Sequence, residues 1–199
     1  MVNSAPRYVI ARTLTAGTLA ALLGVAGCAD NTAAQPSATP AAGASSGAAG
    51  FFGGTDLAWV EIAIAMGEQL VPLLDLAPTH AGTAATRAYA AQVKAFNAQE
   101  LTGLHALHDQ AKLPSENPHE GMSMPGIVTP DEVTAAAATK GAAFDKVLLK
   151  HLRETFDQAT RLATSEEKAG IEPQTLLLAQ TVLNNRAAAL KQLDTFGPA

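Results

Sequence analysis

The sequence predicts an all-α domain. Alanine is abundant, aromatic residues make up only 5% of the chain, and there is no run of alternating β-branched residues of the kind that indicates a strand. Apolar residues instead recur at spacings of three and four along four long stretches, which is the period of helices that bury one face. The chain has 199 residues, and its first quarter has the composition of a leader and linker, so we expect one domain with one modest core. That domain is predicted to cover residues 55–199 as a four-helix bundle.

Residues 1–27 have the layout of a bacterial secretory signal. Two arginines precede an uncharged apolar stretch that is too short for a transmembrane helix. The stretch ends Val25-Ala26-Gly27-Cys28, which resembles the lipobox at which lipoproteins receive a diacylglycerol and are cleaved. The alternative is an ordinary cleaved signal that happens to contain a cysteine. We favour the lipoprotein, because Cys28 is the only cysteine and stands where the chemistry needs a thiol.

Residues 28–54 are predicted to be a lipidated, flexible tether. The segment consists mainly of Ala, Gly, Ser, Thr and Pro with almost no charge, so it cannot bury enough apolar surface to offset the entropy lost on folding. Two or more acyl chains on Cys28 give stable anchoring without help from protein charge. We therefore expect the protein to be exported and held by lipid to the outer face of the bacterial cell membrane.

The charge of the chain argues against nucleic acid as a partner. The whole sequence contains 13 Lys and Arg against 18 Asp and Glu. Arg7 and Arg12 leave with the leader, so 11 basic residues remain against 18 acidic ones, a net charge of −7. A domain of that sign is a poor partner for phosphate backbones or anionic headgroups. Membrane association must then come from the lipid.

The first hairpin is predicted to run from Thr55-Asp56 to the end of a helix near Gln110. Thr55 and Asp56 are good N-cap residues, Pro72 should kink the first helix and Pro78 should close it. The second helix begins near Ala84, and its inward apolar stripe contains Tyr89, Val93, Phe96, Leu101 and Leu104.

The second hairpin follows a Pro- and Gly-rich loop over residues 112–128. Thr129-Pro130-Asp131-Glu132 is a capping-box pattern that opens a short helix, and Gly141 is expected to separate it from a longer one. The last helix should start near Pro173 and stop at Gly197-Pro198. Since Asp56 and Asp145 open similar long helices in the two halves, we interpret the domain as a duplicated hairpin packed as a bundle.

Several segments together resemble the domain of unknown function 305 family over about residues 56–196. The resemblance is carried by Leu70-Val71, by Asp75-Leu76-Ala77-Pro78-Thr79, by Arg87, Val93, Asn97, Glu100 and Leu101, by Gly121-Met122-Ser123-Met124-Pro125-Gly126 and by Gly141-Ala142-Ala143-Phe144-Asp145-Lys146. It implies a duplicated, ferritin-like four-helix bundle that is frequent in exported bacterial proteins.

The family's hallmark is a His-His pair ten and eleven residues after the Asp of each repeat, and some members are linked to metal binding in the envelope. Here those positions hold Met66 and Gly67 in the first repeat, and Thr155 and Phe156 in the second. The fourth helix also has Ala189 where the family tends to have Glu. The family's implied metal site therefore does not transfer to this chain.

Two groups of residues remain as tentative metal ligands. His105, His108 and Asp109 share a helix face, although we favour the reading in which histidines near a helix C-terminus simply meet the helix dipole. His119, Met122 and Met124 lie in the loop and offer an imidazole and two thioethers, which suit Cu(I). Copper is thus a possible cofactor and otherwise none is expected.

Glu100 is expected to point partly inward, where a carboxylate needs a partner. Arg153 or Lys150 could supply it. The sequence has no His-Glu-x-x-His motif and no phosphate-binding Gly loop. The leading hypothesis is a non-enzymatic bundle that binds another envelope protein or a small ligand, and the alternative is envelope metal handling.

Overall fold

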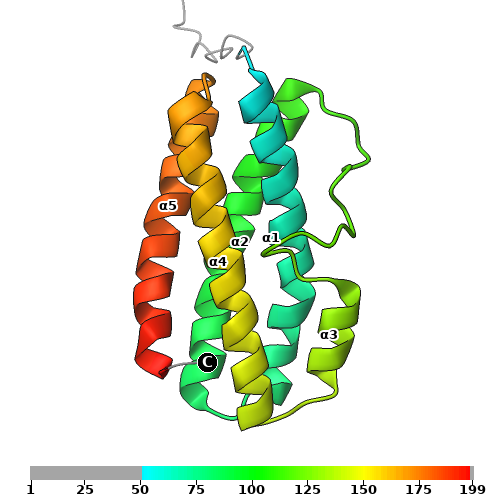
Figure 1. The fold of residues 1–199 in the computed structure, drawn as a ribbon, viewed down its shortest axis with the longest axis vertical. Coiled ribbons are helices and arrows are strands. Elements are labelled where there is room, and N and C mark those ends of the chain that lie inside the picture. The colour runs from blue at the N-terminus through cyan, green and yellow to red at the C-terminus, as the bar shows by residue number, and fades with distance from the viewer. Residues whose placement is uncertain (1–50, 198–199) are drawn as a thin grey trace, which may run out of the picture. The chain divides into compact units, whose positions relative to one another are not determined.

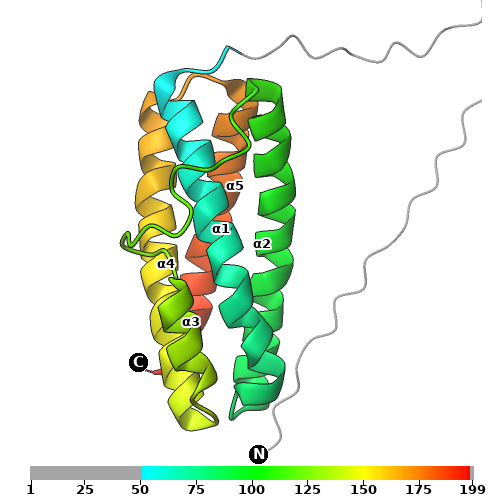
Figure 2. The same ribbon diagram turned by 90° about the vertical axis from the view of Figure 1, so that its right-hand side faces the viewer.

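The computed structural model describes residues 51–197, which form a helical bundle (Figures 1 and 2). The predicted leader (residues 1–27), the lipid-bearing Cys28 and most of the predicted tether lie outside the described residues. Those three assignments therefore stay predictions.

Four long helices build the bundle as two antiparallel hairpins. The first hairpin is α1 (Gly54–His80) with α2 (Ala84–Ala111), and the second is α4 (Ala142–Ala169) with α5 (Pro173–Leu193). A short helix, α3 (Pro130–Ala137), lies in the connection between the hairpins and packs on α1 and α4, and a 3-10 turn, η1 (Asp194–Phe196), follows α5. The predicted all-α, four-helix architecture is confirmed.

Local capping chemistry sets the start of the second hairpin as predicted. Thr129 accepts a hydrogen bond from the backbone N–H of Glu132 at 3.3 Å, and Glu132 accepts one from the N–H of Thr129 at 2.8 Å, which completes the capping box of α3. Gly141 precedes α4 with a φ of +62°, a conformation that glycine adopts without the penalty of a Cβ atom.

The prediction that Pro78 closes α1 is wrong by a few residues. The helix continues through Pro78 to His80, and the N–H of Ala81 still donates to the carbonyl of Ala77 at 3.1 Å. Proline lacks the N–H that would bond four residues back and disturbs the turn before it, but it does not prevent the residues after it from being helical.

Helix α1 is the apolar centre of the fold. By length and composition it could cross a membrane, with a mean hydropathy of 1.5 over its best window, yet half of that window is buried inside the bundle. Eleven of its residues are buried, among them Trp59, Leu70 and Leu73. This is the pattern of a core helix enclosed by neighbours.

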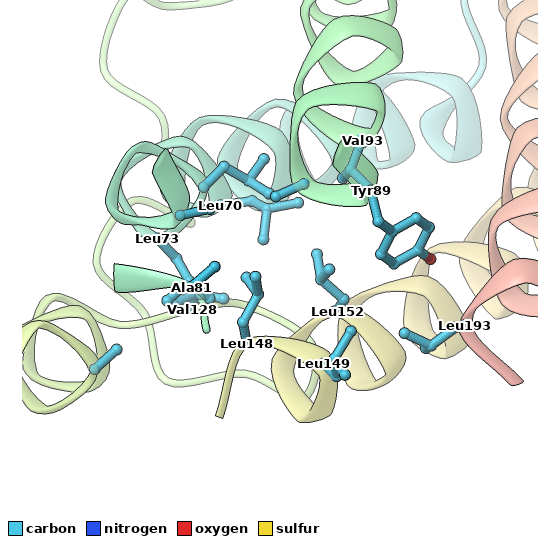
Figure 3. Packing of buried hydrophobic residues seen from close by; sticks show 14 of the residues in the cluster. Leu70, Leu73, Ala81, Tyr89, Val93, Val128, Leu148, Leu149, Leu152 and Leu193 are labelled. Atoms are coloured by element: carbon cyan, nitrogen blue, oxygen red, sulfur yellow. The ribbon is translucent and has the colours of Figure 1, made fainter. Parts of the chain in front are cut away.

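The apolar core consists of two clusters that follow one another along the bundle. One surrounds Trp59 and Ile64 near the start of α1, and the other surrounds Leu73 and Phe144 near its end. Figure 3 shows the second cluster, in which Leu70 and Leu73 of α1 and Val93 of α2 face Leu148 and Leu152 of α4. Polar residues of α2, α4 and α5 lie where the two clusters meet.

Each end of the bundle is closed by an aspartate of one hairpin that binds the loop of the other. At one end, Asp56 of α1 accepts hydrogen bonds from the N–H groups of Gly53 at 2.6 Å, Ile171 at 3.0 Å and Glu172 at 3.1 Å. At the other end, Asp145 of α4 accepts one from the N–H of Gly82 at 2.9 Å. The two aspartates that marked the repeats in the sequence therefore tie the hairpins to each other.

Candidate functional site

The centre of the bundle holds the positions where the family resemblance implies paired histidines. All four positions are buried: the exposed fraction is 4% or less for Met66, Thr155 and Phe156, and Gly67 is buried beside them. Asn97 donates to the carbonyl of Gly67 at 2.9 Å, and a Cβ atom on Gly67 would lie 2.9 Å from the side chain of Leu101. Helix α2 thus approaches α1 closely, and an imidazole at Gly67 would require the side chains of Leu101 and Asn97 to move.

A buried ion pair dominates this layer. Arg186 of α5 donates from both terminal nitrogens to Glu100 of α2, at 3.1 Å and 2.6 Å, and Asn185 donates to the same carboxylate at 2.8 Å. The Glu100 and Arg186 side chains are only 5% and 7% exposed. The bidentate geometry, with a further donor, meets the requirement that a buried charge be both paired and hydrogen-bonded.

Aromatic rings complete the surroundings of the guanidinium. The Cζ atom of Arg186 lies 5.0 Å from the ring centre of Phe96 and 5.2 Å from that of Phe156. Both distances fall within the range of cation–π attraction. One of the two rings, Phe156, stands at a position where the family resemblance implies a histidine, and here it packs against a cation.

The partner predicted for Glu100 is wrong. Arg153 instead donates to Asp194 at 2.6 Å, and Lys150 forms an exposed pair with Glu154 at 3.2 Å. The repeat carried a signal for the true partner. Asp145 stands 89 residues after Asp56, and the same shift makes Arg186 the equivalent in the second repeat of the inward-facing Asn97 in the first.

A small cavity of about 30 Å³ adjoins the ion pair. Trp59, Met66, Leu104 and Val182 supply apolar walls, and Arg186 supplies a polar one. A space of this size accommodates about one water molecule. In this conformation the bundle centre does not admit a ligand of several heavy atoms.

The residues at the bundle centre do not fit a metal ion. A guanidinium stays protonated at any physiological pH, so Arg186 places a permanent positive charge beside the only carboxylate of this layer. Across residues 51–197 there is no group of three or more His, Cys, Asp or Glu side chains arranged to hold a metal. No metal-dependent step can be assigned to this centre.

The first set of tentative ligands is split between different partners. His105 lies 3.2 Å from Glu68 of α1, whereas Nε2 of His108 lies 3.0 Å from the carbonyl of Pro114. Nδ1 of His108 is 3.6 Å from Asp109, whose side chain is 87% exposed. The two histidines are thus on one helix face, as predicted, but each is engaged by its own neighbour.

The second set, in the loop, is also divided. The N–H of Met122 bonds to the carbonyl of His119 at 3.2 Å, which makes a tight turn with Met122 45% exposed. Nδ1 of His119 is buried and has no hydrogen-bond partner within residues 51–197. Met124, in contrast, packs against the core cluster around Trp59. Only His119 and Met122 remain available to a metal.

A cluster of three buried carboxyl groups at the start of α1 was not predicted from the sequence. Glu166 is fully buried beside Asp56, and Glu172 accepts two bonds from Thr175, at 2.6 Å and 2.8 Å. Burial, the hydrogen bond with Asp56 and the charges of Asp56 and Glu172 raise the pKa of Glu166 to about 8. Burial opposes ionisation of Asp56 too, but the bond from Glu166 and the three backbone N–H groups outweigh it and lower its pKa. Glu166 is therefore the protonated member of the pair at neutral pH, and its proton is the one available to bridge the two carboxyl groups.

Comparisons with known proteins agree with this fold. The family model described as domain of unknown function (DUF305) matches residues 56–196. A crystal structure of a DUF305 fragment from Deinococcus radiodurans superimposes with a TM-score of 0.67 at 12% identity, covering 73% of this chain and 96% of that one.

A second crystal structure, of a DUF305 protein from Streptomyces coelicolor that is provisionally named as secreted, gives a TM-score of 0.64 at 14% identity, covering 71% of this chain and 89% of that one. Comparison with curated proteins found no match. Since the family model spans well over half of the sequence, from the first aspartate of the bundle to its last turn, the chain belongs to the DUF305 family.

Proposed function

We propose that this protein is an exported lipoprotein, anchored through Cys28 at the outer face of the bacterial cell membrane, whose bundle works by binding an envelope protein and not by catalysis. The carrying observation is the filled bundle centre. Where a ferritin-like site would hold reactive groups, Glu100 is bonded to Arg186 and Asn185. Nε of Arg186 is the one nitrogen of the guanidinium without a partner among the described residues, and the neighbouring space fits about one water.

The surface offers a place for such a partner. A groove of about 500 Å³ runs between the linker, residues 123–129, and one side of α4. Lys150, His151, Glu154, Asp157 and Arg161 line it in both signs of charge. Mixed polar surface of this kind fits the rim of a protein interface better than a small apolar ligand.

The anchor is tested by labelling cells with a fatty-acid analogue. We expect the full-length chain to incorporate the label and to sediment with membranes, and the Cys28→Ala variant to do neither. A labelled Cys28→Ala variant, or an unlabelled native chain, would contradict the lipoprotein assignment.

Partner binding is tested with a photo-crosslinking residue in place of Asp157 in the groove. Glu167, exposed on the same helix but outside the groove, is the matched control. We expect one discrete crosslinked envelope protein from position 157 and none from position 167. Identical patterns at both positions would contradict a specific interface in the groove.

Copper handling is the second candidate, and the turn that joins His119 and the exposed Met122 favours it. An imidazole and a thioether suit Cu(I). Under anaerobic titration, His119→Ala with Met122→Leu should lower Cu(I) uptake, while His105→Ala with His108→Ala serves as the comparison on the α2 face. Unchanged uptake in both double variants would remove this candidate.

A further inference from the structure

Exposed apolar side chains gather at the end of the bundle where the chain enters it. Within residues 51–197, four large hydrophobic residues are exposed: Phe51 at 79%, Leu177 at 70%, Ile171 at 53% and Met122 at 45%. Phe51 directly precedes the start of α1, Ile171 lies in the loop between α4 and α5, and Leu177 is on the second turn of α5. Figure 1 shows that these segments share one end of the bundle. We call Phe51, Ile171 and Leu177 the apolar cap.

The cap is held in place by the buried carboxyl cluster. Asp56 binds the N–H groups of Gly53 and Ile171 at the same time, which fixes the chain entry against the α4–α5 loop. A Cβ atom on Gly53 would lie 3.2 Å from the Ile171 side chain, so the two segments are in contact. Phe52 packs into the core cluster around Trp59 while its neighbour Phe51 points out. The cap residues are thus exposed on segments that hydrogen bonds and core packing hold in place.

The same arrangement removes negative charge from this surface. Asp56, Glu166 and Glu172 are at 0%, 0% and 2% exposure, so three carboxyl groups at this end lie beneath the cap and not on it. Glu167 and Lys168 of the last α4 turn stay exposed at this end, so it is the three apolar side chains of the cap, and not the whole end, that can meet the polar–apolar boundary of a lipid layer.

The position of the lipid anchor in the chain indicates that the membrane is what contacts the cap. Cys28 stands 22 residues before position 50, and a flexible coil of that length, which the composition of this segment predicts, has an r.m.s. span of roughly 25 Å. The opposite end of the bundle is roughly 40 Å farther away, the length of the 27-residue α1. If the chain is anchored as proposed above, the cap is therefore the end that faces the membrane.

We propose that the apolar cap rests on the lipid surface, with Phe51, Ile171 and Leu177 inserted at the headgroup boundary of neutral, zwitterionic lipid. The net negative charge of the chain disfavours anionic lipid. The anchor and the cap together orient the bundle with α1 pointing away from the membrane, which leaves the groove beside α4 open to an envelope partner. This inference rests on the lipoprotein proposal.

The test uses the full-length lipidated protein reconstituted into phosphatidylcholine vesicles that carry brominated acyl chains. Single variants Phe51→Trp, Ile171→Trp and Leu177→Trp place a fluorophore in the cap, and Met122→Trp is the matched exposed control away from it. Trp59, the only native tryptophan, is 4% exposed and gives a constant background that the parent protein measures. All four substitutions are at exposed positions, so the fold should persist.

We expect blue-shifted emission and at least about twofold quenching at the three cap positions, and neither at position 122. Vesicle flotation without cap quenching would overturn the cap while leaving the anchor intact. Equal quenching at position 122 would overturn the orientation. A protein that does not float would overturn both the lipoprotein proposal and the cap that rests on it.

Discussion

The two repeats place different groups at matching positions. A shift of 89 residues pairs Asp56 with Asp145, Asn97 with Arg186 and Ala77 with Glu166. It also pairs the N-cap residues of α2 and α5, Thr83 and Glu172, each of which accepts a bond from a threonine N–H three residues on. The backbone plan is thus repeated, but at the buried positions of Arg186, Glu166 and Glu172 the second repeat carries an ionisable side chain where the first has a neutral one.

The difference shows what the extra charges do. Arg186 of the second hairpin pairs with Glu100 of the first, and Glu166 of the second holds a proton that can bridge to Asp56 of the first. Two of these three groups therefore act between the hairpins, whereas the side chain of Glu172 caps its own helix α5. We infer that the apolar stripes bring the hairpins together and that these two contacts fix how they align, since buried polar pairs tolerate little displacement.

The largest expected effect comes from removing the central cation. Arg186→Leu leaves Glu100 buried and unpaired, which should destabilise the fold by about 3–5 kcal/mol. Urea unfolding followed by circular dichroism measures it. The double variant Glu100→Gln with Arg186→Leu should recover much of the loss, because no uncompensated charge remains. Equal losses in the single and double variants would mean that packing between Phe96 and Phe156, and not the ion pair, holds this layer.

The contacts of Asp56 and Asp145, which join the hairpins at the two ends of the bundle, should differ in how much they stabilise the fold. Asp56 accepts three backbone hydrogen bonds and Asp145 accepts one from its facing loop, and a bond to a charged group contributes about 1.5–3 kcal/mol. We expect Asp56→Ala to cost about 2–4 kcal/mol and Asp145→Ala about 1–2 kcal/mol on the same scale. The two urea midpoints compared under one set of conditions test this. A larger loss at Asp145 would contradict the ranking of the ends.

Local signals predicted most of the fold, because caps and helical periodicity are read within one or two turns. Thr129 and Glu132 cap α3 as expected, and Gly141 precedes α4. The exception was Pro78, where a breaker residue lies inside a helix whose end is set by the loop bonds around Ala81 and Gly141, including the bond from the Gly141 N–H to the His80 carbonyl at 2.8 Å.

Long-range polar partners escaped prediction for a physical reason. Glu100 was expected to face inward, and it does, but its partner lies 86 residues away on α5. Helical periodicity tells which face of a helix is buried and says nothing of which residue of another helix stands at the same height. The proton held by Glu166 beside Asp56 was missed on the same grounds, since Glu166 sits among charged residues that read as an exposed helix end.

The smallest of the three effects, and the most specific, concerns the proton held by Glu166. Its pKa of about 8 in the folded protein lies above the ordinary value of 4.5, so the folded state binds more protons than the unfolded state between those two values. Stability should therefore fall as pH rises from about 4.5 to about 8 and level off beyond. Glu166→Gln keeps a donor toward Asp56 but cannot ionise, and it should flatten this dependence.

We expect native and Glu166→Gln proteins to melt at similar temperatures near pH 4.5 and the variant to melt a few degrees higher at pH 9. The gain should be modest, because the loop after Gly170 can open locally and relieve an ionised Glu166 without unfolding the bundle. Lys168→Gln, which changes an exposed charge on the same turn, is the matched control and should follow the native pH profile. If the melting temperatures of the variant and the native protein stay parallel across this range, the raised pKa of Glu166 is contradicted. The two ends of the bundle would then differ in their hydrogen bonds and not in the protonation of a buried carboxyl group.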